Sequence, residues 1–145
     1  MCIRDRHSTG GAAALAGAII IGPRLGRFTK SGSPAPIKPF AASSIPLVTL
    51  GVFVLWLGWF GFNGGSQLAM GTADDAIAVS TIFINTFLAG AGGVIGAAII
   101  TRLHFGKTDV VQMLNGCIGG LVAVTAEPLA PSPLAAILIL SLIHI

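Results

Sequence analysis

Apolar and polar positions divide the chain into long hydrophobic runs, separated by short segments rich in charged residues, proline and glycine. The runs predict helices at residues 7–21, 45–68, 76–103, 110–125 and 134–140. The run at 45–68 corresponds to about 36 Å of helix, which is enough to cross a hydrocarbon core of about 30 Å with some tilt. The pattern therefore predicts an all-α polytopic membrane protein with about four helices and a truncated fifth.

The two ends of the chain do not fit this pattern. The charged residues 4–6 directly precede the run at 7–21, which as a helix is only about 22 Å long and too short to span the bilayer. A native helix extended upstream would carry these charges into the bilayer at a cost of roughly several kcal/mol. We therefore expect residues 1–6 and the closing SLIHI at 141–145 to be non-native read-through. Residues 7–140 are then a segment cut at both ends.

Composition narrows the class of protein. Hydrophobic residues make up 54% of the chain and charged residues 9%, with a mean hydropathy of +0.90, whereas charged residues make up about a quarter of a soluble domain. The net charge of +3 does not indicate a nucleic-acid partner, because the basic residues are sparse and lie between apolar runs. Cys2 and Cys117 have neither metal-site nor disulfide spacing, and we expect Cys117 to be a small packing residue inside a helix.

The charges between the predicted helices differ in sign from loop to loop. The first and third loops hold the basic residues Arg24, Arg27, Lys30, Lys38, Arg102 and Lys107, and the second and fourth hold only Asp74, Asp75 and Glu127. The positive-inside rule then predicts that the first and third loops are cytoplasmic. The helix at 45–68 therefore runs outward, and we expect Ser66 near the external mouth.

The stretch Leu55–Ser66 combines aromatic rings with a hydroxyl. At 3.6 residues per turn, one helix face carries Leu55, Trp59, Phe62 and Ser66. Such a face can be a stripe that meets lipid or core, or it can line a pathway. Ser66, one turn after Phe62, favours the pathway, because a hydroxyl beside aromatic rings can hold a small cation that sheds water.

Glycines and one asparagine predict close helix packing. Glycines that we expect to face a neighbouring helix are Gly58, Gly61 and Gly65, together with the GxxxG pairs Gly92/Gly96 and Gly116/Gly120. We expect Asn85 to form a hydrogen bond between helices rather than to line a pore. The sequence contains no nucleophile–base pair, metal-ligand cluster or phosphate loop, so it does not indicate an enzyme or a cofactor.

Three stretches together resemble the ammonium transporter family, the Amt/Mep branch of the Amt/Rh superfamily. They are GWFGFNGGS (Gly58 to Ser66), the HxxxG at His7 to Gly11 leading to GPRLGRF (Gly22 to Phe28), and NGCIGGLVAVTAEPLAPSPLAAI (Asn115 to Ile137). The resemblance implies a fragment of an eleven-helix fold with two inverted repeats. It also implies a multi-pass protein of the cell membrane that assembles as a homotrimer with one pore per subunit.

The resemblance also assigns roles to individual residues. Phe62 matches a phenylalanine that gates the external entrance, and Ser66 matches a serine that holds ammonium in the outer vestibule. Trp59 and Leu55 match residues that line the pore below the gate. His7 matches the first of two pore histidines, the second of which lies outside this fragment. The alternative for His7 is a packing residue hydrogen-bonded to a neighbouring helix.

The resemblance thus implies ammonium transport for nitrogen uptake. Ammonium is recruited at the outer vestibule and deprotonated, and ammonia is conducted through an apolar pore that contains histidine. An ammonium sensor coupled to a cytoplasmic signalling partner stays open as the alternative, and the family also allows a regulatory partner of the PII type. A purely structural membrane subunit is a third interpretation, which His7 and the pairing of Phe62 with Ser66 disfavour.

Overall fold

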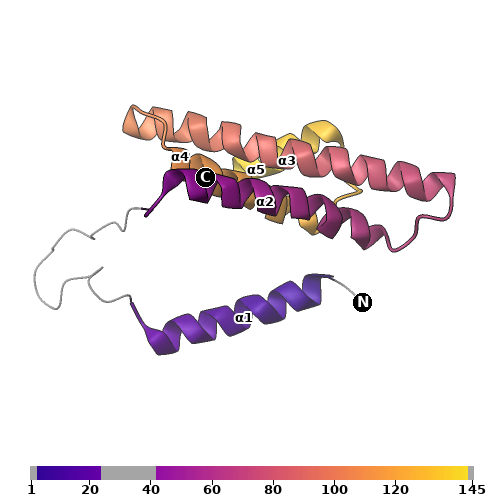
Figure 1. The fold of residues 1–145 in the computed structure, drawn as a ribbon, viewed down its shortest axis with the longest axis horizontal. Coiled ribbons are helices and arrows are strands. Elements are labelled where there is room, and N and C mark those ends of the chain that lie inside the picture. Colours follow the sequence, from indigo (N-terminus) through magenta and orange to yellow (C-terminus); the bar gives the residue numbers. More distant parts are fainter. Residues whose placement is uncertain (1–2, 24–41, 144–145) are drawn as a thin grey trace, which may run out of the picture. The chain divides into compact units, whose positions relative to one another are not determined.

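The computed structural model describes the backbone of residues 3–23 and 42–143 and divides the chain into two units. Unit 1 (Met1–Ser43) contains helix α1 (Ile3–Ile21), and unit 2 (Ser44–Ile145) contains the remaining elements (Figure 1). These are α2 (Ile45–Gly64), the short 3₁₀ helix η1 (Gly65–Gln67), α3 (Ala73–Phe105), α4 (Val110–Thr125) and α5 (Pro133–Ile143). Every regular element of the described residues is helical, as the apolar runs predict.

Helix α1 begins at Ile3 rather than at the predicted His7. The charged residues in between include two arginines, which are good helix formers and continue the helix upstream. The helix ends before Gly22, which adopts a left-handed φ of 73° that glycine reaches without strain. The expectation that both ends of the chain are non-native stays a prediction.

Two helical segments are long and apolar enough to cross a membrane. The first is Ile45–Gln67, in which η1 continues α2 over 23 residues, and the second is α3 with 33 residues. Helix α4 and the stretch Thr9–Ile21 are shorter apolar helices. Most of α2 is not covered by the rest of unit 2, since large side chains such as Leu57 are exposed. In a bilayer these side chains meet lipid or further protein.

A capping box makes α3 begin at Ala73, earlier than the start predicted at residue 76. The Thr72 hydroxyl accepts from the Asp75 N–H at 3.2 Å, and the Asp75 carboxylate accepts from the Thr72 N–H at 3.1 Å. Asp74 and Asp75 therefore belong to the first turn of α3 rather than to the preceding loop. Negative charge is favourable there because it faces the positive end of the helix dipole.

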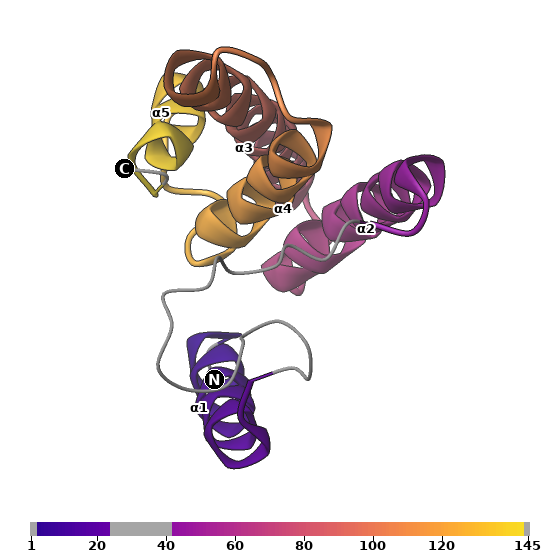
Figure 2. The ribbon, with the colours of Figure 1, turned by 90° about the vertical axis from the view of Figure 1, so that its left-hand side faces the viewer.

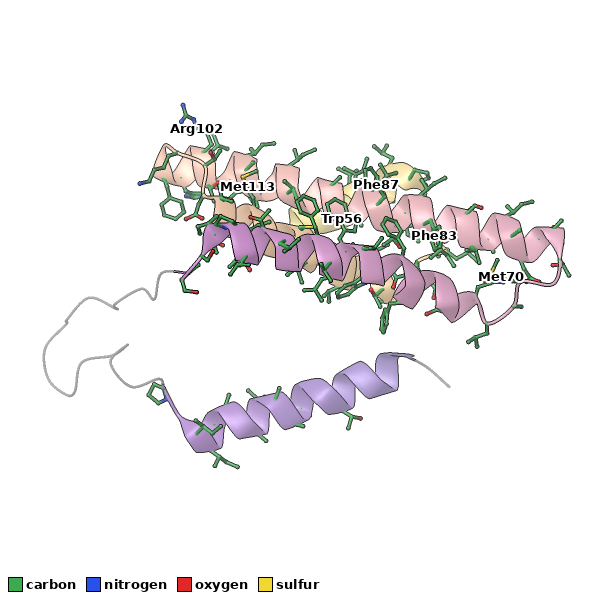
Figure 3. The ribbon with its side chains drawn as sticks, viewed as in Figure 1. Trp56, Met70, Phe83, Phe87, Arg102 and Met113 are labelled. Carbon is green, nitrogen blue, oxygen red and sulfur yellow. The ribbon has the colours of Figure 1, made fainter. Side chains whose placement is uncertain are left out.

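Helix α3 is central in unit 2 and contacts α2, α4 and α5. Helices α2 and α5 lie on opposite sides of the pair formed by α3 and α4 (Figure 2). The long helices alternate in direction, and the acidic first turn of α3 lies at the end of unit 2 where α2 ends (Figure 1). The loop after α4, which contains Glu127, instead meets α3 at Asn85, twelve residues after α3 begins. Arg102 lies in the last turn of α3, at the other end of that helix (Figure 3), and Lys107 follows the helix. Asp74 and Asp75 are therefore at the opposite end of α3 from Arg102. The orientation in the membrane stays a prediction, and the basic residues of the first loop lie outside the described residues.

Close approach at glycines holds α3 against its neighbours, which confirms the packing predicted for the GxxxG stretches at Gly92 and Gly116. A Cβ added to Gly92 would lie 2.8 Å from the Ile137 carbonyl oxygen of α5. A Cβ added to Gly116 of α4 would lie 2.8 Å from the Ala97 Cβ of α3. Each pair of helices therefore approaches more closely than any larger side chain would allow.

The described residues supply no partner for Gly58, Gly61 and Gly65 of α2, so the close packing predicted at these glycines stays a prediction. A Cβ added to Gly58, Gly61 or Gly65 would meet nothing within 4 Å in the described part of the chain. The α2 glycine that is covered is Gly64, whose Cβ position is occupied by the ring of Phe83 in α3. The face of α2 that meets α3 is thus a different one from the face that sequence spacing indicated.

Aromatic stacking forms much of the contact between α2 and α3. The rings of Trp56 and Phe87 stack with centroids 5.6 Å apart (Figure 3). Gly90, one turn after Phe87, leaves room for the indole, because a Cβ there would lie 2.9 Å from Trp56 Cε2. Deeper in unit 2, Cys117 and Leu121 of α4 are fully buried, which confirms Cys117 as a packing residue.

Asn85 holds the loop between α4 and α5 against α3. Its side chain is fully buried, and Nδ2 donates to the Pro128 carbonyl at 3.0 Å and to the Pro131 carbonyl at 2.9 Å. The predicted hydrogen-bonding role of Asn85 is therefore confirmed, although its partners lie in a loop and not in another helix. The partners are loop carbonyls that proline-rich sequence leaves without helical partners.

Candidate functional site

The C-terminal half of α2 presents two aromatic rings beside each other. Trp59 and Phe62 have ring centroids 5.9 Å apart with planes tilted by 59°. Trp59 is half-buried and packs against the cluster of Val52, Cys117 and Leu121, whereas Phe62 is 46% exposed. One ring is thus anchored in unit 2, and the other stands at its surface.

A hydrogen bond fixes the orientation of the Trp59 indole. Nε1–H donates to the Thr125 hydroxyl of α4 at 2.8 Å. The Thr125 hydroxyl in turn donates to the Leu121 carbonyl at 2.6 Å, and only 6% of Thr125 is exposed. Because the polar edge of the indole is already engaged, the π-face is what Trp59 can offer to a cation.

Thr125 is a residue that the sequence analysis did not single out. It ends the helix predicted at 110–125, and a threonine inside an apolar helix usually returns its hydroxyl to the carbonyl four residues before. Its contact with Trp59 joins positions 66 residues apart in the sequence. No local periodicity signals such a pair.

Ser66 lies in η1, directly after α2, and its hydroxyl donates to the Phe62 carbonyl at 3.0 Å. A hydroxyl has one hydrogen and two lone pairs, so a hydroxyl that donates to the backbone presents oxygen lone pairs outward. Outward lone pairs on the Ser66 oxygen suit a ligand that can only donate hydrogen bonds, such as an ammonium ion. The Ser66 hydroxyl therefore lies at the backbone of Phe62, and the binding role predicted for the two residues stays a prediction.

Leu55 precedes Trp59 by one turn of α2 and is half exposed. It shares the face with the aromatic pair and adds an apolar surface below it. His7 lies within α1, in unit 1, and its side chain is outside the described side chains. The role of His7 as a pore residue thus stays a prediction.

An open groove of about 350 Å³ lies where α2 ends and α3 begins. Its lining is apolar and consists of Phe60, Gly61, Gly64, Gly65, Leu68, Ala69, Met70, Val79 and Phe83. Figure 3 shows Met70 and Phe83 at this end of unit 2. Leu55, Trp59, Phe62 and Ser66 do not line it, so the groove and the candidate site are separate features.

Comparisons with known proteins point to one family. The profile of the Ammonium Transporter Family matches residues 6–141. Ammonium transporter Amt2 of Archaeoglobus fulgidus is 43% identical over 120 residues, which cover 83% of this chain and 24% of the relative. Ammonium transporter 1 member 2 of Arabidopsis thaliana is 37% identical over 139 residues, which cover 90% of this chain and 26% of the relative.

A solved structure named Sensor Amt Protein has a similar fold. It superposes with a TM-score of 0.81 at 34% sequence identity, and the match covers 94% of this chain and 32% of that one. The chain spans about a quarter of the length of the curated relatives it matches. On the profile that matches almost all of its residues, together with its membrane-length apolar helices, the chain is a membrane protein that belongs to the Ammonium Transporter Family.

Proposed function

We propose that this chain is a segment of an ammonium-conducting pore, in which Phe62 and Ser66 recruit ammonium at the outer end of α2. The observation that carries the proposal is the hydrogen bond from the Ser66 hydroxyl to the Phe62 carbonyl. It leaves the serine oxygen as an acceptor at the backbone of Phe62, whose side chain is exposed. A cation that donates hydrogen bonds finds both of its preferred partners there.

Recruitment needs interactions that replace the water around the ion. Each contact of a cation with an aromatic face contributes about 0.5–2 kcal/mol, more when water is excluded. Phe62 and Trp59 supply two rings, and Ser66 supplies one oxygen acceptor. The acidic first turn of α3, with Asp74 and Asp75, lies at the same end of unit 2 and attracts cations to it.

Conduction then requires the ion to lose its proton. A charged ion is expensive in an apolar bore, while neutral ammonia is not. Leu55 and the ring of Trp59 form an apolar surface below the Phe62–Ser66 pair, which favours the neutral form. His7 suits the transfer of the proton because either imidazole nitrogen can donate or accept near neutral pH. In this proposal Leu55 lines the path that ammonia takes inward.

The proposal is tested by replacing Ser66 with alanine in the full-length protein that contains this segment. We expect the apparent KM for methylammonium to rise about tenfold, which corresponds to about 1.4 kcal/mol, while the maximal rate per folded protein changes little. Ser80→Ala is the matched control, because the Ser80 hydroxyl makes the same bond to a carbonyl four residues before, on α3. If both variants transport alike, Ser66 is not a binding residue.

A sensor is the second candidate function, and the solved structure named Sensor Amt Protein favours keeping it. A sensor binds ammonium at the same vestibule and passes occupancy to a cytoplasmic partner, with the basic first loop as a candidate contact. Saturating ammonium distinguishes the two, because a transporter shows flux that scales with protein whereas a sensor shows binding without flux. Assembly as a homotrimer and regulation by a PII-type protein are further proposals drawn from the family.

A further inference from the structure

The last turn of α2 faces α3 through two adjacent residues. The buried residues of α2 are Val52, Asn63 and Gly64, so most of the helix is not held by unit 2. Asn63 and Gly64 directly follow Phe62, and η1 with Ser66 comes next. Whatever sets the rotation of this turn also sets where Phe62 and Ser66 face.

Asn63 makes one hydrogen bond across the interface between α2 and α3. Its Nδ2 donates to the Thr86 hydroxyl at 3.0 Å, and both side chains are completely buried. The Asn63 Oδ1 atom has no hydrogen-bond partner among the described residues. The amide is therefore buried with its oxygen unused as an acceptor.

A buried amide of this kind is not the most stable choice for the position. An unpaired buried acceptor costs stability, and an apolar side chain of similar shape avoids that cost. Buried asparagines in coiled coils show what such a residue supplies instead, since they select one register among several helix pairings. A single directional bond does the same for rotation, because only one rotation of α2 brings Nδ2 to the Thr86 hydroxyl.

The neighbouring contact favours the same rotation. The ring of Phe83 occupies the Cβ position of Gly64, so this turn cannot rotate without a collision or a gap. Successive residues of a helix are about 100° apart, so an inward Asn63 leaves Phe62 on the flank of the turn. The hydrogen bond between Ser66 and the Phe62 carbonyl links η1 to that flank.

We propose that Asn63 is a positioning residue, which through its hydrogen bond to Thr86 directs Phe62 and Ser66 toward the outer vestibule. The proposal rests on the function proposed above for Phe62 and Ser66. It adds that Asn63 and Thr86, which touch no substrate, affect the apparent affinity by fixing the positions of Phe62 and Ser66.

The test is a double-mutant cycle in the full-length protein, with methylammonium uptake as the readout. Asn63→Leu and Thr86→Val keep the shapes of the side chains and remove the bond. We expect each to raise the apparent KM at least fivefold, with the maximal rate per folded protein changed less than twofold. The double variant is expected to be no more than twofold worse than the worse single variant, because both remove the same bond. Thr86→Ser keeps the hydroxyl and is expected to retain the original KM.

Asn85→Leu is the matched control. Asn85 precedes Thr86 on α3, is equally buried and also donates from Nδ2, but its partners are the loop carbonyls of Pro128 and Pro131. We expect this variant to lower folded yield and to leave the apparent KM unchanged. If Asn85→Leu raises KM as much as Asn63→Leu does, the effect is a general result of instability and the proposal is overturned. Additive effects of Asn63→Leu and Thr86→Val in the double variant would also overturn it.

A second readout does not depend on transport. A cysteine at Ser66 reports the direction of η1 by its rate of reaction with an impermeant maleimide. Asn63→Leu and Thr86→Val are expected to change that rate at least threefold, and Thr86→Ser and Asn85→Leu are not. If Ser66→Ala leaves KM unchanged, the proposed function fails, yet the maleimide rates still decide whether Asn63 orients η1. Unchanged rates in Asn63→Leu and Thr86→Val overturn the positioning role.

Discussion

Trp59 of α2 donates its indole N–H to the hydroxyl of Thr125 at the end of α4, across 2.8 Å. The same hydroxyl donates to the Leu121 carbonyl one turn earlier in α4. The indole is therefore held by a group that cannot itself rotate freely. The bond joins α2 to α4 at the level of the candidate site and sets which part of Trp59 faces away from unit 2.

Replacing Thr125 with valine should lower stability and loosen Trp59. The indole N–H loses its acceptor, and a buried donor without a partner costs about 1–3 kcal/mol. Thr125→Ser keeps the hydroxyl and should stay close to the original stability. Thermal unfolding of the detergent-solubilised full-length protein measures the difference. Equal melting temperatures for the serine and valine variants would show that the bond contributes nothing.

Replacing Gly116 with alanine should separate α4 from α3. The added Cβ would meet the Gly93 carbonyl oxygen and the Ala97 Cβ, and overpacking of this kind costs about 1–3 kcal/mol. Gly58→Ala is the control, since a Cβ there meets nothing within 4 Å in the described residues. The measurement is the fraction of folded protein after heating. A Gly58 variant that is less stable than the Gly116 variant would contradict the assignment of the packed face.

The charge pattern of the loops predicts the orientation of unit 2 in the membrane. A single cysteine at Lys107 should be protected from impermeant thiol reagents in intact cells, and a single cysteine at Asp74 should be labelled. Permeabilised cells should label both, which controls for buried positions. If only the cysteine at Lys107 is labelled in intact cells, the true orientation is the opposite of the predicted one, and Ser66 lies on the cytoplasmic side.

Two replacements of His7 in the full-length protein distinguish a pore-lining role from a packing role. If His7 only packs, His7→Asn should reduce stability and leave transport per folded protein unchanged. If His7 lines the pore and handles the proton, the same change should alter conduction at normal folded yield. His7→Asp should differ again, because a fixed carboxylate attracts a cation into a bore that a neutral imidazole leaves uncharged. Ammonium current and methylammonium uptake in reconstituted membranes measure both. Unchanged transport in both variants would leave His7 a packing residue.

Local sequence was sufficient for the helices. Apolar runs of membrane length predicted α2 and α3, and glycine spacing predicted the close approach at Gly92 and Gly116. The start of α3 was predicted too late because two aspartates were interpreted as loop residues. Thr72 and Asp75 instead cap the helix, an effect of local hydrogen bonding rather than of hydrophobicity.

Part of the candidate site was also predictable from local sequence. The pairing of Phe62 with Ser66 follows from residues four apart at a helix end, so the sequence alone determined it. The motif at residues 58–66 also determined the family, which the comparisons confirm. Neither of these inferences requires knowledge of which helices are neighbours.

Contacts between distant helices were decided by the tertiary structure alone. Which face of α2 meets α3 depends on the ring of Phe83 over Gly64, a contact that glycine spacing within α2 did not indicate. The anchoring of Trp59 by Thr125 and of Asn63 by Thr86 joins side chains on different helices. Periodicity determines the faces of one helix, but the choice among those faces is made by side chains that meet only after the helices pack.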